Sequence, residues 1–236
     1  MSRASDLDRL YDLFDRLEAK VGGKRRLKNC NGHMDWPERG VYFVFANDET
    51  RDGSDRLRLT RVGTHAVSTG SGTSLWSRLR THRGANRGSY EGGGNHRGSV
   101  FRKHAGRAMI ERDGLGDEYP HWGEGSTADR ERRLAELDHE RRVSEYVRDL
   151  PFLWVDIDDE PGPESDRAYV ERNAIALASN YEEAVVDARG DDWLGRESPR
   201  GEVAASGLWN IDHVEERHDT AFLDRLADAV DETTGL

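Results

Sequence analysis

The chain has 236 residues but only one cysteine, Cys30, so no disulfide can form within it. This excludes a disulfide-stabilised secreted scaffold, and we expect a reducing cytoplasm as its location. The sequence also has no run of about 18 apolar residues, the length that a membrane helix needs. We therefore expect no membrane span. The first residues are charged and helical in pattern, unlike a secretion signal.

Lysine is scarce as well, with four lysines beside 31 arginines. Aspartate and glutamate together number 46, and the formal net charge is -11. An acidic, arginine-rich and lysine-poor composition is typical of proteins adapted to a salty cytoplasm, where surface carboxylates keep them soluble. We therefore predict a halophilic protein.

The charge is distributed unevenly along the sequence. Residues 71–110 contain eight basic residues and a single acidic one, Glu91, which gives a local charge of +7. A basic region on an acidic protein is typical of phosphate binding, so we expect nucleic acid as the partner of a monomer or homodimer. An arginine-rich surface loop paired with the acidic tail of the chain would have the same composition, and that alternative stays open.

Two predicted strands lie in the first third of the chain. Residues 41–46 are apolar and β-branched or aromatic, which is typical of a buried strand. Residues 57–62 alternate leucine with arginine or threonine and precede Gly63, which indicates a half-buried strand. The turn-rich residues between them predict a β-hairpin. Residues 75–83 follow with the spacing of a helix, which places Arg78 and His82 on one face.

The order of these features resembles the GIY-YIG endonuclease superfamily. Residues 40–42, Gly-Val-Tyr, match its first tripeptide, and residues 61–63, Arg-Val-Gly, stand where the second belongs. Arg78 and His82 match the arginine and the frequent histidine of the helix that follows. Several features in the right order carry the resemblance, because each tripeptide alone is common.

The resemblance implies an α+β fold with a small three-stranded antiparallel sheet flanked by helices. It covers residues 40–180, with an insert at 84–150. We expect the third strand at 152–157 and the next helix at 165–179, ahead of Asn180.

The remaining segments are expected to pack on this domain. Residues 1–39 form an amphipathic helix, predicted at 5–20, followed by a solvated basic loop around Lys24 to Lys28. Residues 181–236 form a C-terminal extension that closes with a helix at 220–231. Within the insert, we predict one helix near 100–110 and one long charged surface helix at 127–150.

The resemblance also implies hydrolysis of phosphodiester bonds with Mg²⁺ or Mn²⁺. Glu171 is the expected metal ligand, since one carboxylate suffices when water and phosphate oxygens complete the shell. Asn180 is expected beside it, and Arg78 would hold the scissile phosphate. The expected catalytic residues are Tyr42, Arg61, Arg78, His82, Glu171 and Asn180.

Arg61 departs from the family pattern, in which the second tripeptide normally begins with a tyrosine that could activate the attacking water. The general base is therefore left open between His82 and Tyr42. The departure also supports an alternative function, a catalytically impaired nucleic-acid-binding module with the same fold.

Residues 84–98 form a glycine-rich segment with interleaved basic residues, which predicts a phosphate-contacting loop. A disordered surface loop is the alternative. The expected nucleic-acid contacts are His65, Arg83, Arg87, Asn95, His96, Arg97 and Arg102. We expect DNA as the substrate, and an insert with its own recognition surface favours the restriction-type branch.

Overall fold

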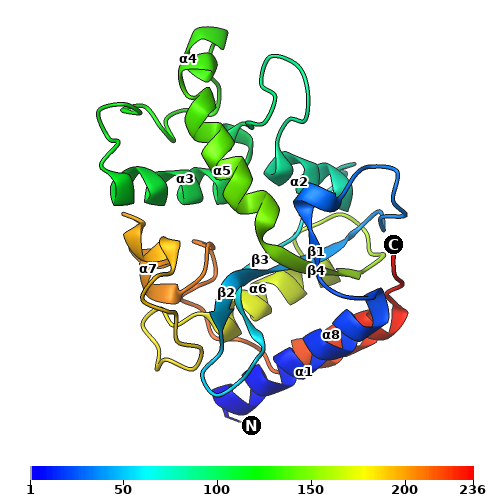
Figure 1. The fold of residues 1–236 in the computed structure, drawn as a ribbon. Coiled ribbons are helices and arrows are strands. Elements are labelled where there is room, and N and C mark those ends of the chain that lie inside the picture. Colours follow the sequence, from blue (N-terminus) through cyan, green and yellow to red (C-terminus); the bar gives the residue numbers. More distant parts are fainter. Residues whose placement is uncertain (1) are drawn as a thin grey trace.

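The computed structural model describes residues 2–236, and a four-stranded antiparallel sheet lies at its centre (Figure 1). The strand order is β1-β4-β2-β3. β2, Gly40–Thr50, lies between β4, Pro151–Asp156, and β3, Leu57–Gly63. The predicted α+β class is confirmed, and the three main strands appear where the sequence placed them.

The fourth strand, β1, is Arg25–Arg26, within the segment predicted as a solvated loop. It pairs with the outer edge of β4, so that Arg25 lies opposite Phe152. The Arg26 guanidinium donates to Asn47 Oδ1 over 2.6 Å. The prediction was wrong because two residues are too few to show the alternation of a strand.

Helices α1, Arg3–Val21, α6, Asp166–Ala178, and α8, Phe222–Glu232, cover one face of the sheet. α1 and α8 lie side by side below the sheet in Figure 1. Phe14 of α1 packs on Phe43 and Phe45 of β2, with ring centroids 4.8 and 5.2 Å apart. These three helices confirm the predicted segments, with ends shifted by one or two residues.

Helices α2, Leu75–Arg83, α3, Val100–Asp113, and α5, Leu137–Asp149, pack together above the opposite face (Figure 1). Because side chains alternate along a strand, Tyr42 and Val44 of β2 point to this side. The sheet is therefore covered on both faces, and both α2 and α5 of the insert contact this face.

The predicted long helix at 127–150 is two helices. α4, Arg130–Ala135, ends before Glu136, and α5 begins after it. The expected surface character was also wrong, because α5 buries His139, Glu140, Val143 and Ser144 against the molecule. Charged and polar residues here face inward because they pair with α3 and with the glycine-rich segment.

The C-terminal extension adds short helices at Leu194–Glu197 and α7, Gly201–Ser206. Two further short 3₁₀ helices, Leu27–Asn29 and His96–Gly98, lie in loops. Trp193 and Trp209 are buried in contact with each other, and one continuous hydrophobic core includes residues from both termini and the insert. None of the helices within residues 2–236 is long and apolar enough to cross a membrane.

Candidate active site

Two glycines fix the packing around Tyr42. Tyr42 lies opposite Gly63 in the β2–β3 pair, and a Cβ added to Gly63 would lie 2.2 Å from the Tyr42 hydroxyl oxygen. A Cβ on Gly40 would lie 2.2 Å from the carbonyl oxygen of Val155. Both distances are far below van der Waals contact, so the glycines of both tripeptides are steric requirements of the sheet.

Tyr42 and His82 form a buried hydrogen-bonded chain with Ser99. The Tyr42 hydroxyl and His82 Nε2 are 2.7 Å apart, and His82 Nδ1 is 2.7 Å from Ser99 Oγ. Their exposed fractions are 0% and 1%, so neither reaches solvent. Burial, with the charges of Arg78 and Arg61, holds the pKa of His82 well below its usual value. The imidazole is therefore neutral and lies within the core.

Three predicted site residues line one cleft of about 200 Å³. Arg61 comes from β3, Arg78 from α2 and Glu171 from α6. Ser74 caps the N-terminus of α2, and Ser165 caps that of α6, by accepting hydrogen bonds from Ser77 N and Ala168 N. The structure thus brings together two arginines from the first third of the chain and a carboxylate that lies about 90 residues or more further along the sequence.

Glu171 stands in the wall of this cleft. Its Oε1 accepts a hydrogen bond of 3.0 Å from the backbone N–H of Thr64, at the end of β3. Burial raises the pKa of Glu171, and the charge of Arg61 and the Thr64 hydrogen bond oppose that rise. Oε2 makes no hydrogen bond with any residue in the range 2–236, so this oxygen is left for a ligand.

The two arginines of the cleft differ from most others in the chain. Arg61 Nη1 donates to the carbonyl of Trp209 over 3.0 Å, and its guanidinium lies over the ring of Phe101. Arg78 is partly exposed. Within the described part of the chain, neither forms an ion pair with a carboxylate. Because neither guanidinium is held in a direct ion pair, both can bind an anionic group.

Asn180 does not line the cleft. Its Nδ2 donates to the carbonyl of Asp187 and its Oδ1 accepts from Val186 N, so the amide closes a local loop. Asn210 lies in the cleft wall instead, with its amide bonded to both backbone groups of Val62 at the edge of β3. The predicted place for Asn180 was therefore wrong, and Asn210 was missed.

His65 lies near the cleft without lining it. Its Nδ1 is 2.6 Å from the carbonyl oxygen of Thr73, which holds the loop between β3 and α2. Burial lowers the pKa of His65 to about 4. A neutral imidazole in this position stabilises the loop, and it offers no charge to a phosphate near neutral pH.

The expectation that Arg102 and His96 contact phosphate does not fit their positions. Arg102 is fully buried and donates to Glu140 Oε2 over 3.1 Å and to the carbonyl of His82 over 2.9 Å. His96 Nδ1 is 2.9 Å from Glu140 Oε1. Burial raises the pKa of Glu140, but the His96 hydrogen bond and the Arg102 charge outweigh it and lower this pKa to about 2.

The Arg97 guanidinium is likewise paired with a glutamate of the insert. Its two Nη atoms donate to the carboxylate of Glu136 over 2.6 and 2.8 Å, between α4 and α5. Asn95 accepts from Arg97 N and so caps a 3₁₀ turn. Arg97 and Arg102 therefore pair with carboxylates of the insert itself. This differs both from the predicted phosphate-contacting loop and from the alternative of a loop paired with the acidic tail.

The remaining two predicted contacts are the last residue of α2 and a residue shortly after it. Arg83 donates to the carbonyl of Cys30 over 2.6 Å and lies over the ring of Trp76. Arg87 is exposed and forms no ion pair within residues 2–236. Of the predicted nucleic-acid contacts, Arg87 thus remains free to meet a ligand.

The donor set of the cleft suits a single hard cation. No group of three or more histidine, cysteine, aspartate or glutamate side chains in residues 2–236 could hold a metal ion. Glu171 provides one free carboxylate oxygen. Mg²⁺ retains several water ligands and accepts substrate phosphate oxygens, so one protein carboxylate is a sufficient anchor.

The sequence comparison agrees with the geometry. A family model described as the GIY-YIG domain matches residues 1–236. No curated protein and no solved structure matches the chain. The match extends beyond the two tripeptides to both terminal segments, which share the core of the sheet. The chain belongs to the GIY-YIG domain family.

Proposed function

We propose that this protein is a divalent-metal-dependent endonuclease that hydrolyses phosphodiester bonds of DNA. Its family implies nuclease-type activity on nucleic acid. The convergence of Arg61, Arg78 and Glu171 on one cleft carries the proposal, because hydrolysis of a phosphodiester needs cationic groups and a metal anchor around one phosphate.

The arginines would hold the scissile phosphate. A guanidinium offers forked donors that match phosphate oxygens and stays charged at all working pH values. Arg78 is the better placed of the two, because its guanidinium makes no hydrogen bond to any residue of the described chain. The Arg61 guanidinium is bonded to the carbonyl of Trp209 and would present a fixed positive charge to the cleft.

Glu171 would hold Mg²⁺ or Mn²⁺ through Oε2. The bound ion would neutralise charge on the phosphate and polarise it toward attack. Oε1 stays bonded to Thr64 N, so the carboxylate keeps one orientation as the substrate arrives. This proposal uses Glu171 alone as the protein ligand and omits Asn180, which lies elsewhere.

Tyr42 and His82 do not line the cleft, so they would act on the substrate only indirectly. Both are buried, and their hydrogen bond connects β2 to α2 one turn beyond Arg78. We propose that this connection sets the direction of Arg78, in place of the general-base role that the sequence left open for either residue.

The test is cleavage of supercoiled plasmid and of a structured RNA, with Mg²⁺ or with a chelator, at low and molar salt. We expect nicking of plasmid that requires the metal. Glu171→Gln should stop cleavage while plasmid binding persists, and exposed Glu164→Gln should behave like wild type.

Thermal unfolding gives a second readout of the metal site. Mg²⁺ should raise the Tm of the wild type, because a ligand that binds only the folded state stabilises it, and should not raise that of Glu171→Gln. Cleavage that survives in Glu171→Gln would remove Glu171 from the proposed mechanism.

Arg61 in the position of the family tyrosine favours one other function, nucleic-acid binding without cleavage. The plasmid cleavage and binding assays distinguish this binding function from the nuclease function. Salt-sensitive binding of plasmid, with no nicking under any metal condition, would establish the binding module and reject the nuclease.

A further inference from the structure

The cleft contains a histidine that the family motifs do not include. His213, in the segment after Trp209, lines the cleft together with Glu171 and Arg61. Its side chain is 37% exposed, and Nδ1 is 2.8 Å from Glu216 Oε1. Nε2 makes no hydrogen bond with any residue in the range 2–236. One ring nitrogen is therefore held by a carboxylate, and the other is free to meet a ligand.

The position of His213 is fixed from two directions. Glu216 also accepts a hydrogen bond from Nε of Arg172, the residue next to Glu171 on α6. On the other side, Asn210 binds the edge of β3. His213 itself has a positive φ of 65°, a conformation that non-glycine residues seldom adopt outside special sites. The surrounding contacts hold this backbone, so the imidazole is preorganised beside Glu171.

The other histidines near the cleft are poorly placed for proton transfer to a substrate. His82 is buried in its hydrogen bonds to Tyr42 and Ser99. His65 has a pKa lowered to about 4 by burial, and it does not line the cleft. Among the described residues that line the cleft, His213 is the only histidine.

We propose that His213 is a catalytic residue and that Glu216 is its positioning residue, an inference that rests on the proposed nuclease function. Nε2 accepts a proton from the attacking water while the water oxygen forms its bond to phosphorus. The bond from phosphorus to the leaving oxygen breaks, and that oxygen keeps the electron pair and takes a proton from solvent. Glu216 stabilises the imidazolium that results.

The charged groups around His213 come from every neighbouring element. Glu216 and Asp212 belong to its own segment, Glu171 and Arg172 to α6, Arg61 to β3 and Arg78 to α2. The group that is hydrogen-bonded to the ring is the Glu216 carboxylate.

The test is single-turnover cleavage of plasmid with Mg²⁺ by wild type and by His213→Gln and His213→Asn, over a range of pH. Asparagine tolerates positive φ, so the second variant preserves the backbone. We expect the rate to fall by about 100-fold or more in both, with plasmid affinity nearly unchanged and a flatter pH profile. Glu216→Gln should reduce the rate less.

Two controls and one rescue complete the test. His33→Gln and Glu215→Gln alter exposed residues outside the cleft and should cleave at the wild-type rate. His213→Gly suits the positive φ, and free imidazole should restore part of its cleavage. A residue with only a structural role would not be rescued in this way.

If the wild type cleaves plasmid and both His213→Gln and His213→Asn cleave it at the same rate, His213 is not a catalytic residue. The proposed nuclease function would be unaffected by that result. Low rates in both variants without any rescue of His213→Gly by imidazole would also overturn the inference that His213 is catalytic. Wild-type protein that binds plasmid but never cleaves it would reject the nuclease function, and this inference with it.

Discussion

Two arginines on α2 show how position decides a role at the scale of one residue. Arg78 lines the cleft without a carboxylate partner in residues 2–236, whereas Arg80 is exposed two residues further along and lies outside the cleft. Because the two side chains are identical, any difference in their function comes from their different positions on the helix. The same holds for Asn180 and Asn210, of which only the second lies in the cleft wall.

We predict that Arg78→Ala lowers both plasmid affinity and the cleavage rate. Loss of a donor that neutralises charge on the phosphate costs about 10²–10³ in rate. The affinity falls because the same guanidinium would hold the ground-state phosphate. Fluorescence anisotropy and single-turnover kinetics measure the two effects.

The matched control for this prediction is Arg80→Ala, which removes the same charge from the same helix. We expect it to cleave at nearly the wild-type rate. Equal losses in both variants would mean that general charge, rather than the cleft, binds the nucleic acid.

At the scale of elements, the hairpin of β2 and β3 depends on glycine. Tyr42 occupies the space above Gly63, and the ring continues into the hydrogen bond with His82 of α2. The second tripeptide therefore joins the sheet to the helix that carries Arg78. A side chain at position 63 would displace the Tyr42 ring and so disturb its hydrogen bond with His82, even when no ligand is bound.

We predict that Gly63→Ala destabilises the protein by about 1–3 kcal/mol or more, the usual cost of overpacking a core. The new Cβ would lie 2.2 Å from the Tyr42 hydroxyl oxygen, so the ring must move. Chemical denaturation measures the change. Gly72→Ala, where no atom lies within 4 Å, is the control and should be nearly neutral. A neutral Gly63→Ala would contradict the packing described here.

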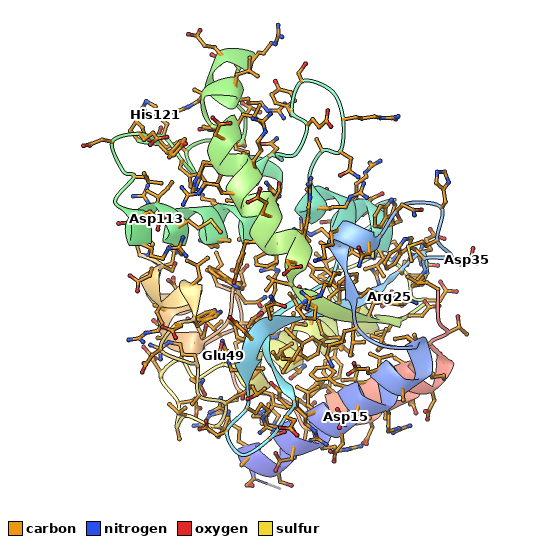
Figure 2. The ribbon with its side chains drawn as sticks, in the orientation of Figure 1. Asp15, Arg25, Asp35, Glu49, Asp113 and His121 are labelled. Carbon is orange, nitrogen blue, oxygen red and sulfur yellow. The ribbon has the colours of Figure 1, made fainter. Side chains whose placement is uncertain are left out.

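At the scale of the whole molecule, charged side chains lie on elements from different parts of the fold, among them Asp15 of α1, Glu49 of β2 and Asp113 of α3 (Figure 2). Asp113, labelled at the end of α3, pairs with Arg112 over 2.7 Å and also with Arg142 of α5. Such pairs join elements across the surface. The basic region at 71–110 does not form a carboxylate-free surface around Arg97 and Arg102, because each of these arginines is paired with a glutamate.

Buried histidines predict how the whole fold responds to acid. Burial lowers the pKa of His65 and His104 to about 4, from the usual histidine value of 6.5. Below pH 6.5 the unfolded chain binds protons that the folded chain does not, so stability is lost as the pH falls through this window toward 4. We predict a lower Tm at pH 5 than at pH 7, measured by calorimetry.

Single substitutions test whether a buried histidine causes the dependence of the Tm on pH. His104→Gln removes one neutral buried imidazole, so its Tm should fall less steeply between pH 7 and pH 5. Exposed His33→Gln should show the wild-type slope. Parallel slopes for all three proteins would show that His104 does not contribute.

The sequence by itself determined the three main strands, the helices before and between them, and their order, but not β1 or the break between α4 and α5. Alternation in residues 57–62, the apolar run at 41–46 and the helical spacing at 75–83 are local periodicities, and each element formed within one or two residues of its predicted place, except that β2 extends further. The glycines at 40 and 63 carried the family resemblance because sterics permits no other residue there.

Only the tertiary structure decided which side chains meet. Arg97 and Arg102 looked available for phosphate because their partners, Glu136 and Glu140, lie almost forty residues away in sequence. His213 gave no signal, since its carboxylate partner and its cleft neighbours are assembled by packing against β3 and α6. A local sequence pattern indicates whether a segment forms a helix or a strand, because it repeats with the period of that element. Which side chains are buried or paired depends on how separate elements pack against one another.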